Sequence, residues 1–264
     1  MAKKNALIDV VPLSDAAWQA IPWLWLPFFS LGKLHYLFGA SGNGCTLLVI
    51  AFAASLTLGS PWPNGAKACE PGAVAYLSAS DTPGDILLPR FKAAGADLSK
   101  VFALGKYLRT LDGADKTIDF TDTECVAMLE SVLRGIPGIK MLIIDPISQF
   151  LGNIDANDLI AVRQALFPLQ SLAERLSIAV VYLNHSNKTT GKSGANRSNG
   201  STAFIDMART AFMVDVEQNG IRVMKAVKSS YSSLPSDIHF SIVQDDVSQA
   251  AKIEWHNEVV TKKM

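Results

Sequence analysis

The stretch KLHYLFGASGNGCTLLVIAFAASLTL, residues 33–58, decides the fold. Its apolar beginning predicts a buried β-strand over residues 33–38, and its apolar end predicts a buried helix over residues 46–58. A glycine-rich turn joins the two. Strand, glycine-rich turn and helix in this order predict a phosphate-binding loop. Glycines let several backbone N–H groups surround one phosphate at a helix N-terminus, where the helix dipole favours negative charge.

The turn carries a nearly complete phosphate-loop motif. Residues 39–46, GASGNGCT, match the pattern G-x-x-x-x-G-K-[ST] except that Cys45 stands in place of the lysine. Cys45 cannot bring the lysine's positive charge to the β- and γ-phosphates. We expect anion binding by the backbone to persist and transition-state stabilisation to be largely lost. The candidate nucleotide-binding residues are Gly39, Ala40, Ser41, Gly42, Asn43, Gly44, Cys45 and Thr46.

Cys45 is also expected to be a reactive thiol. It lies at a predicted helix N-terminus, where backbone N–H groups stabilise a thiolate. Cys69 and Cys125 share no metal-type spacing with it, and an odd number of cysteines argues against a disulfide framework. The sequence therefore predicts that Cys45 is alkylated fastest of the three, and it favours a reducing, cytoplasmic setting.

Apolar runs alternate with helical patterns along the rest of the chain. This predicts one α/β domain over residues 1–264, with a mainly parallel central sheet flanked by helices. The Asn219-Gly220 turn signal predicts an antiparallel C-terminal hairpin. An N-terminal lead-in spans residues 1–30, and the apolar stretch over residues 21–37 is expected to pack on the sheet edge. The further predicted strands are 73–78, 101–104, 141–144, 178–183, 208–216, 221–227 and 238–243, and the predicted helices are 82–94, 121–134 and 159–176.

A second acidic element follows the strand predicted over residues 141–144. Asp145 stands at the carboxyl end of this strand, which meets the same sheet edge as the phosphate loop. In P-loop proteins such an aspartate holds magnesium through water, and a threonine in the position of Thr46 contributes its hydroxyl. A helix-capping role is the alternative for Asp145, but the phosphate loop upstream favours magnesium.

Five motifs follow one another along the chain: GASGNGCT (39–46), LSASD (77–81), IIDPISQFLG (143–152), LNHSNK (183–188) and GSTAFIDMAR (200–209). In this order they resemble the RepA branch of RecA-like hexameric helicases, which are plasmid replicative helicases with relatives among AAA-type ATPases of phages and mobile elements. The resemblance covers about residues 23–242 and implies a RecA-like fold. It also implies binding of ATP or ADP with Mg, a homo-oligomeric ring of six subunits and association with single-stranded DNA.

The resemblance assigns roles to matched positions. Thr46 and Asp145 would serve Mg, and His185 would sense the γ-phosphate. Arg209 would be an arginine finger for the next subunit's nucleotide, and Lys228 resembles a second finger. Plainer alternatives are a structural histidine and a surface ion pair.

The same resemblance marks a candidate DNA-contacting loop over residues 188–201. Lys188, Lys192 and Arg197 could contact phosphates there, although loop cations are often only solvated. The lead-in tryptophans Trp18, Trp23 and Trp25 could cover a partner subunit.

Two further departures bear on catalysis. The family places a water-orienting glutamate where this chain has Ser80. Asp81 is the carboxylate that could partly replace this glutamate, from a position one residue further along the chain. An arginine two residues beyond Lys228 is replaced by Ser230. Because losing one such element costs orders of magnitude in rate, we expect weak or absent ATP hydrolysis. The alternative is a non-hydrolysing pseudo-ATPase that acts as an oligomeric scaffold or DNA-binding assembly protein.

Composition limits the function classes. Lysine plus arginine and aspartate plus glutamate each number 24, so no overall basic charge points to nucleic acid, and any DNA contact must be local. Residues 21–37 are apolar but contain two prolines, Gly32, Lys33 and His35, which makes them a poor membrane span. A membrane partner is therefore not expected.

Overall fold

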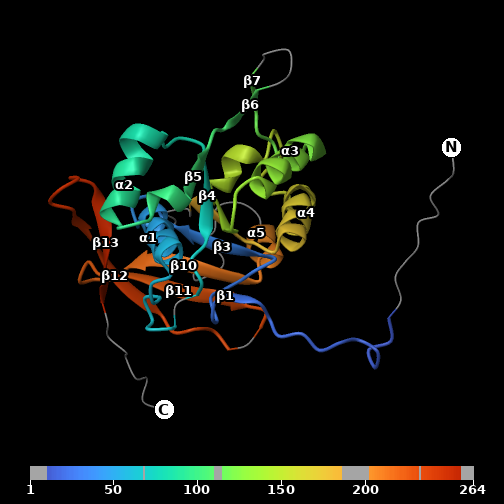
Figure 1. Cartoon of the computed structure of the whole chain (residues 1–264), viewed down its shortest axis with the longest axis horizontal. Helices are drawn as coiled ribbons and strands as arrows, with labels where there is room; N and C mark the ends of the chain where they lie inside the picture. Colours follow the sequence, from blue (N-terminus) through green and yellow to red (C-terminus); the bar gives the residue numbers. More distant parts are fainter. Residues whose placement is uncertain (1–10, 68, 110–114, 186–201, 232, 257–264) are drawn as a thin grey trace.

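A computed structural model describes the chain except for residues 1–10, 68, 110–114, 186–201, 232 and 257–264. Its main feature is a nine-stranded sheet in the order β13-β12-β11-β10-β3-β9-β8-β4-β5 (Figure 1). The strands from β10 to β5 run parallel, and β11, β12 and β13 continue the sheet antiparallel. The predicted α/β class, mainly parallel sheet and antiparallel C-terminal hairpin are confirmed, and the architecture is that of a P-loop NTPase.

The strands of the large sheet are β3 (Lys33–Gly39), β4 (Ala73–Ser78), β5 (Val101–Leu104), β8 (Ile139–Asp145), β9 (Ala179–His185), β10 (Thr210–Val216), β11 (Arg222–Ser229), β12 (Ile238–Gln244) and β13 (Ala251–His256). Two small hairpins are formed by β1 (Trp23–Trp25) with β2 (Phe29–Ser30) and by β6 (Tyr107–Arg109) with β7 (Asp115–Thr117). The sequence had not predicted β13, whose six residues are only partly buried, or these hairpins, whose strands of two or three residues carry little periodicity.

Helices cover both faces of the sheet. α1 (Cys45–Leu58) and α2 (Leu88–Ala93) bury their side chains in one apolar cluster, and α3 (Thr123–Arg134), α4 (Leu159–Leu176) and α5 (Ala203–Met207) bury theirs in another. The helix predicted over residues 82–94 begins as a π-helical turn, Pro83–Leu87, before α2. 3₁₀ turns span Leu98–Lys100 and Ile147–Phe150. No helix in the described part of the chain has both the length and the apolarity needed to cross a bilayer.

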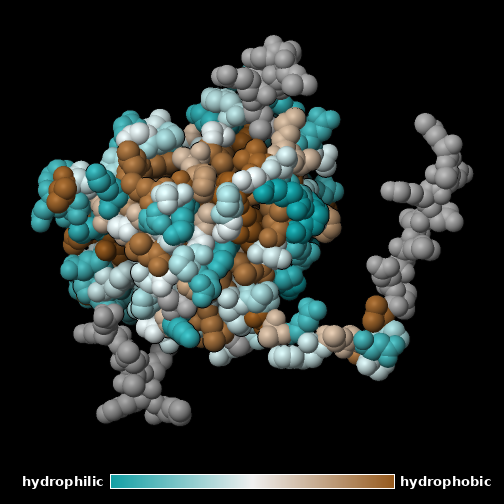
Figure 2. All heavy atoms as spheres, in the orientation of Figure 1, coloured by the Kyte–Doolittle hydropathy of each residue, from teal (hydrophilic) through white to brown (hydrophobic). Residues whose placement is uncertain are grey.

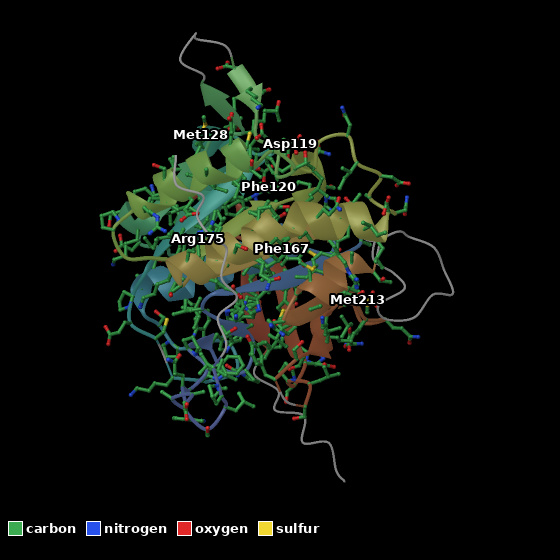
Figure 3. All side chains as sticks on the ribbon, turned by 90° about the vertical axis from the view of Figure 1, so that its right-hand side faces the viewer. Asp119, Phe120, Met128, Phe167, Arg175 and Met213 are labelled. Atoms are coloured by element: carbon green, nitrogen blue, oxygen red, sulfur yellow. The ribbon has the colours of Figure 1, made fainter. Side chains whose placement is uncertain are left out.

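The outer surface of α3 and α4 is shown in Figure 3. Met128 on α3 and Phe167 on α4 are 47% and 62% exposed. Arg175 of α4 binds both carboxylate oxygens of Glu130 on α3. Its Nη2 donates to Oε2 at 2.5 Å, and its Nε lies 3.2 Å from Oε1 and 3.1 Å from Oε2, so this ion pair links the two helices. Together, α3 and α4 cover one face of the sheet.

The lead-in does not pack on a sheet edge, and this expectation was wrong. Trp25 is 1% exposed and stacks on Trp62, with ring centroids 4.8 Å apart. Phe28 stacks at 5.6 Å on Phe212 of β10, which is an interior strand. A tryptophan and several phenylalanines bury much more apolar area against a face of the sheet beside α1 than an edge could offer.

The chain N-terminal to β1 has a different environment. Residues 11–22 are all exposed and run away from the body of the molecule (Figures 1 and 2). Trp18 is 87% exposed, whereas Trp23 packs edge-on against Tyr231 at 4.8 Å. Of the three tryptophans considered for covering a partner, Trp25 is thus excluded by burial.

A buried histidine ties the lead-in to the central strands. The Nδ1 atom of His35 in β3 lies 2.7 Å from Thr210 Oγ1, and the Thr210 hydroxyl donates to the Phe28 carbonyl oxygen. The Ser30 N–H donates to His35 Nε2 at 3.1 Å. Burial lowers the pKa of His35 to about 4, and the Ser30 carbonyl oxygen, 2.9 Å from Nε2, has a smaller opposing effect. The neutral imidazole therefore holds the β1–β2 hairpin on β3.

Candidate functional site

The phosphate loop connects β3 to α1 with the backbone geometry that its glycines allow. Gly42 and Gly44 have φ of 89° and 96°, in a region that side-chain-bearing residues rarely adopt. A Cβ on Gly39 would lie 2.7 Å from the Val214 carbonyl oxygen, so β10 approaches the loop closely. The Asn43 side chain donates to that oxygen at 2.9 Å. The loop is therefore fastened to β10 while its tip, Ser41 and Gly42, remains exposed.

Thr46 and Asp145 meet beside this loop. The Thr46 hydroxyl donates to Asp145 Oδ2 at 2.7 Å, and the Tyr76 hydroxyl donates to the same oxygen at 2.8 Å. Burial raises the pKa of Asp145, and the two hydrogen bonds oppose this rise. A hydroxyl and a carboxylate oxygen next to a glycine-lined loop suit the oxygen-ligand preference of Mg²⁺, so these residues fit a magnesium ion.

Tyr76 was missed by sequence reasoning. It lies in a six-residue strand that is buried throughout, β4, and pairs in register with Ile143 on β8. A tyrosine in an otherwise apolar strand is usually core, so only the folded structure shows that its hydroxyl reaches Asp145. Burial and the Asp145 carboxylate raise the pKa of Tyr76 well above its usual value, so it remains a donor.

His185 lies directly beside the start of the phosphate loop. It is the last residue of β9, where it pairs in register with Gly39 of β3, and it is exposed. It is among the smaller influences that oppose the burial-driven rise in the pKa of Asp145. The fold thus brings the predicted sensor position to the same sheet edge as Thr46 and Asp145.

Ser80 and Asp81 follow the end of β4 at this edge. Ser80 is exposed, and the Asp81 N–H donates to Ser78 Oγ at 2.9 Å. The Asp81 carboxylate forms an ion pair with Arg90 of α2, with Nη1 and Oδ2 2.6 Å apart. Asp81 is therefore already bound to a cation, which sequence reasoning did not foresee.

A family model described as an AAA domain matches residues 6–191 of the chain. This is well over half of the 264 residues and includes the phosphate loop, Asp145 and His185. The chain belongs to the AAA domain family. AAA-type P-loop ATPases bind nucleotide with Mg, and the site described above is built from the matched segment. A search of the curated proteins finds no match for this chain.

The expected reactivity of Cys45 in this AAA domain is contradicted. The side chain is 8% exposed, and its Sγ lies so close to Gly39 that a Cβ added to that glycine would be 2.9 Å from it. Burial and the Asp145 carboxylate raise the pKa of the Cys45 thiol to about 12, and the backbone N–H groups of the helix start oppose this only weakly. Loss of hydration outweighs the helix N-terminus, so the thiol stays protonated.

The two proposed finger residues of the AAA domain lie at the opposite sheet edge. The Arg209 N–H donates to the Leu34 carbonyl oxygen, which places Arg209 at the start of β3 and roughly 16 Å from Gly39 along that strand. Arg209, Lys228 and Ser230 share a pocket of about 150 Å³. The remaining lining residues of this pocket are Gln170, Asp206, Met207 and Ala208.

Lys228 is hydrogen-bonded within its own chain. Its Nζ donates to the carbonyl oxygens of Ile205 and Asp206 at 3.0 and 2.7 Å, at the end of α5. Desolvation lowers its pKa. Arg209 is exposed beside it. The family match ends at residue 191, so both residues lie beyond it. Lys188, Lys192 and Arg197 lie outside the described residues.

Proposed function

We propose that this chain is a RecA-like AAA domain of the RepA helicase type, which binds ATP or ADP with Mg and works as a ring on single-stranded DNA. The observation that carries the proposal is the 2.7 Å hydrogen bond from Thr46 to Asp145 next to the glycine-rich loop. It joins the two oxygen donors that a magnesium ion bound to a nucleotide needs.

Each residue has a defined task in this function. The backbone N–H groups of the loop bind the phosphates, since Gly42 and Gly44 leave no side chain in the way. Thr46 and Asp145 hold Mg, which would neutralise phosphate charge when bound. Tyr76 fixes the orientation of the Asp145 carboxylate, and His185 at the end of β9 is positioned to contact the phosphate end of the nucleotide.

Hydrolysis is proposed to be weak or absent. Cys45 supplies no charge, because its thiol is buried and protonated. Ser80 is not a carboxylate, and Asp81 is neutralised by Arg90 at 2.6 Å. Binding and turnover are thereby separated: the binding elements are intact, while the groups that would stabilise the transition state or orient water are replaced or occupied.

We propose assembly into a ring from the place of Arg209. An arginine roughly 16 Å from the loop of its own subunit can serve a nucleotide only if another subunit brings one. A head-to-tail contact of this kind is heterologous and forms a ring when its rotation closes. The exposed Trp18 and the chain around it offer additional apolar surface for such a neighbour. We propose six subunits.

DNA association is proposed for the loop 188–201. Lys188, Lys192 and Arg197 would bind phosphates, so affinity for single strands should fall steeply with added salt. The net charge of zero is consistent with a local contact of this kind.

The second candidate is a pseudo-ATPase that binds nucleotide only to assemble. The presence of Cys45 in place of the motif lysine, together with Ser80 in place of the glutamate, favours it. Nucleotide binding and hydrolysis measured side by side, with and without single-stranded DNA, separate the two. Mg-dependent binding with turnover that DNA stimulates supports the motor, and binding without turnover supports the scaffold. Absence of nucleotide binding would refute both.

A further inference from the structure

The phosphate site lacks its usual lysine, so the cations near it in the described residues are of interest. Lys33 lies at the opposite end of β3, paired with Glu174 at 2.9 Å. Two other cations lie at the carboxyl end of β4: Arg90, bound to Asp81, and Lys106, whose Nζ donates to the Ala79 carbonyl oxygen at 3.1 Å. Lys33 is too far along the strand to act, which leaves the latter two.

The position of Arg90 is set by its neighbour Phe91. Phe91 is 1% exposed and packs edge-on against Tyr76, with ring centroids 5.8 Å apart. The hydroxyl of that same tyrosine binds Asp145, which in turn binds Thr46. One chain of contacts therefore connects α2 to the magnesium-binding pair and fixes the root of the Arg90 side chain beside it.

Arg90 also acts electrostatically on this site. Burial and the Asp145 carboxylate raise the pKa of Tyr76, and the Arg90 guanidinium is among the charges that oppose the rise. Asp81 acts on both Tyr76 and Asp145. Arg90 and Asp81 thus lie within electrostatic reach of the position that a nucleotide phosphate and its metal would take.

We propose that Arg90 replaces the missing lysine: it exchanges Asp81 for the phosphates of a bound nucleoside triphosphate. This inference rests on the proposed nucleotide-binding function. A guanidinium suits the exchange because its planar fork binds carboxylate and phosphate oxygens with the same geometry. Its side chain is 30% exposed, so it can turn without disrupting the core. Cys45 leaves the required space free of a competing cation.

The exchange has a second consequence for Asp81. In the ion pair this carboxylate is neutralised, and when Arg90 turns to the phosphates it is left without its cation. The same movement that brings positive charge to the nucleotide therefore frees a carboxylate three residues beyond the end of β4. Asp81 and the nucleotide compete for one guanidinium.

Competition gives the two partners opposite effects, which a merely structural ion pair would not. We expect Arg90→Gln to weaken binding of a non-hydrolysable ATP analogue with Mg roughly tenfold to a hundredfold, the range for losing a hydrogen bond between charged groups. Asp81→Asn should tighten binding of the same analogue, because it releases Arg90. Binding is measured by calorimetry on the full chain, with thermal unfolding as a check of folding.

Two matched variants complete the experiment. Lys92→Gln removes an exposed cation two residues along the same helix, and Lys106→Gln removes the other cation at the end of β4; both should bind the analogue as the parent chain does. Equal losses in Arg90→Gln and Asp81→Asn, or no loss in Arg90→Gln, would overturn the exchange while leaving the proposed function standing. If the parent chain binds neither the analogue nor ADP, the proposed function itself fails.

Discussion

The hydroxyl of Thr46 donates a 2.7 Å hydrogen bond to the carboxylate of Asp145, although the two residues are 99 positions apart in the chain. Thr46 is the second residue of α1 and Asp145 is the last residue of β8, so the contact depends on the parallel strands ending at one edge.

Thr46→Val keeps the shape of the side chain and removes the hydroxyl. We expect it to lower Mg-dependent affinity for ADP at least tenfold and the free energy of unfolding by about 1 kcal/mol, since Asp145 keeps its bond from Tyr76. Thr46→Ser is the matched control and should retain both. Calorimetry with Mg or with a chelator measures the difference. Affinity that does not respond to Mg in the parent chain would contradict the assignment.

Cys45→Lys restores the missing charge and should tighten ATP binding. By itself it should give little turnover, because Ser80 still offers no carboxylate. The double variant Cys45→Lys with Ser80→Glu is expected to regain measurable hydrolysis, followed as phosphate release. If the parent chain already hydrolyses ATP rapidly, Cys45 and Ser80 do not limit catalysis as we propose. No gain in the double variant would mean that other positions also limit catalysis.

Alkylation should spare Cys45. Its thiol is buried and has a pKa of about 12, so the thiolate fraction near pH 8 is negligible. Burial also raises the pKa of Cys69, but that residue is half-buried. Iodoacetamide labelling followed by mass spectrometry is therefore expected to modify Cys69 before Cys45. The reverse order would restore the expectation drawn from the sequence alone.

Arg209→Ala should abolish nucleotide-dependent assembly without changing nucleotide affinity in dilute, unassembled protein. The reason is that Arg209 lies at the sheet edge opposite the phosphate loop. Light scattering with ATP and Mg at high protein concentration reports the assembly. Arg134→Ala, which removes an exposed arginine on α3, serves as the control. A parent chain that stays monomeric under these conditions would rule out the ring.

His35 should make the fold sensitive to mild acid. Its pKa is about 4 in the folded chain and about 6.5 when unfolded, so the unfolded state binds more protons between these values. Its contribution, at most roughly 3 kcal/mol, is complete above pH 6.5 and is lost as the pH falls towards 4. Urea unfolding across this range should show a steeper pH dependence for the parent chain than for His35→Gln. Parallel pH profiles would remove His35 from this role.

The sequence also predicted more of the fold than of the site. The glycine turn, the four apolar parallel strands that flank or follow it, and the helix α4 were all visible, because each depends on residues close together in the chain. β13 was missed, as its six residues are only partly buried and resemble a polar surface segment.

What the sequence by itself determined is the order of strand, loop and helix and the types of residue at each strand end. Only the tertiary structure decided how deeply those residues are buried and which charged groups lie beside them. Cys45 lost its expected reactivity because the sheet and Asp145 enclose it, and Asp81 gained a partner because Phe91 anchors α2 against Tyr76. Periodicity and turn chemistry are local, whereas burial and charge pairing depend on which distant strands and helices share an edge.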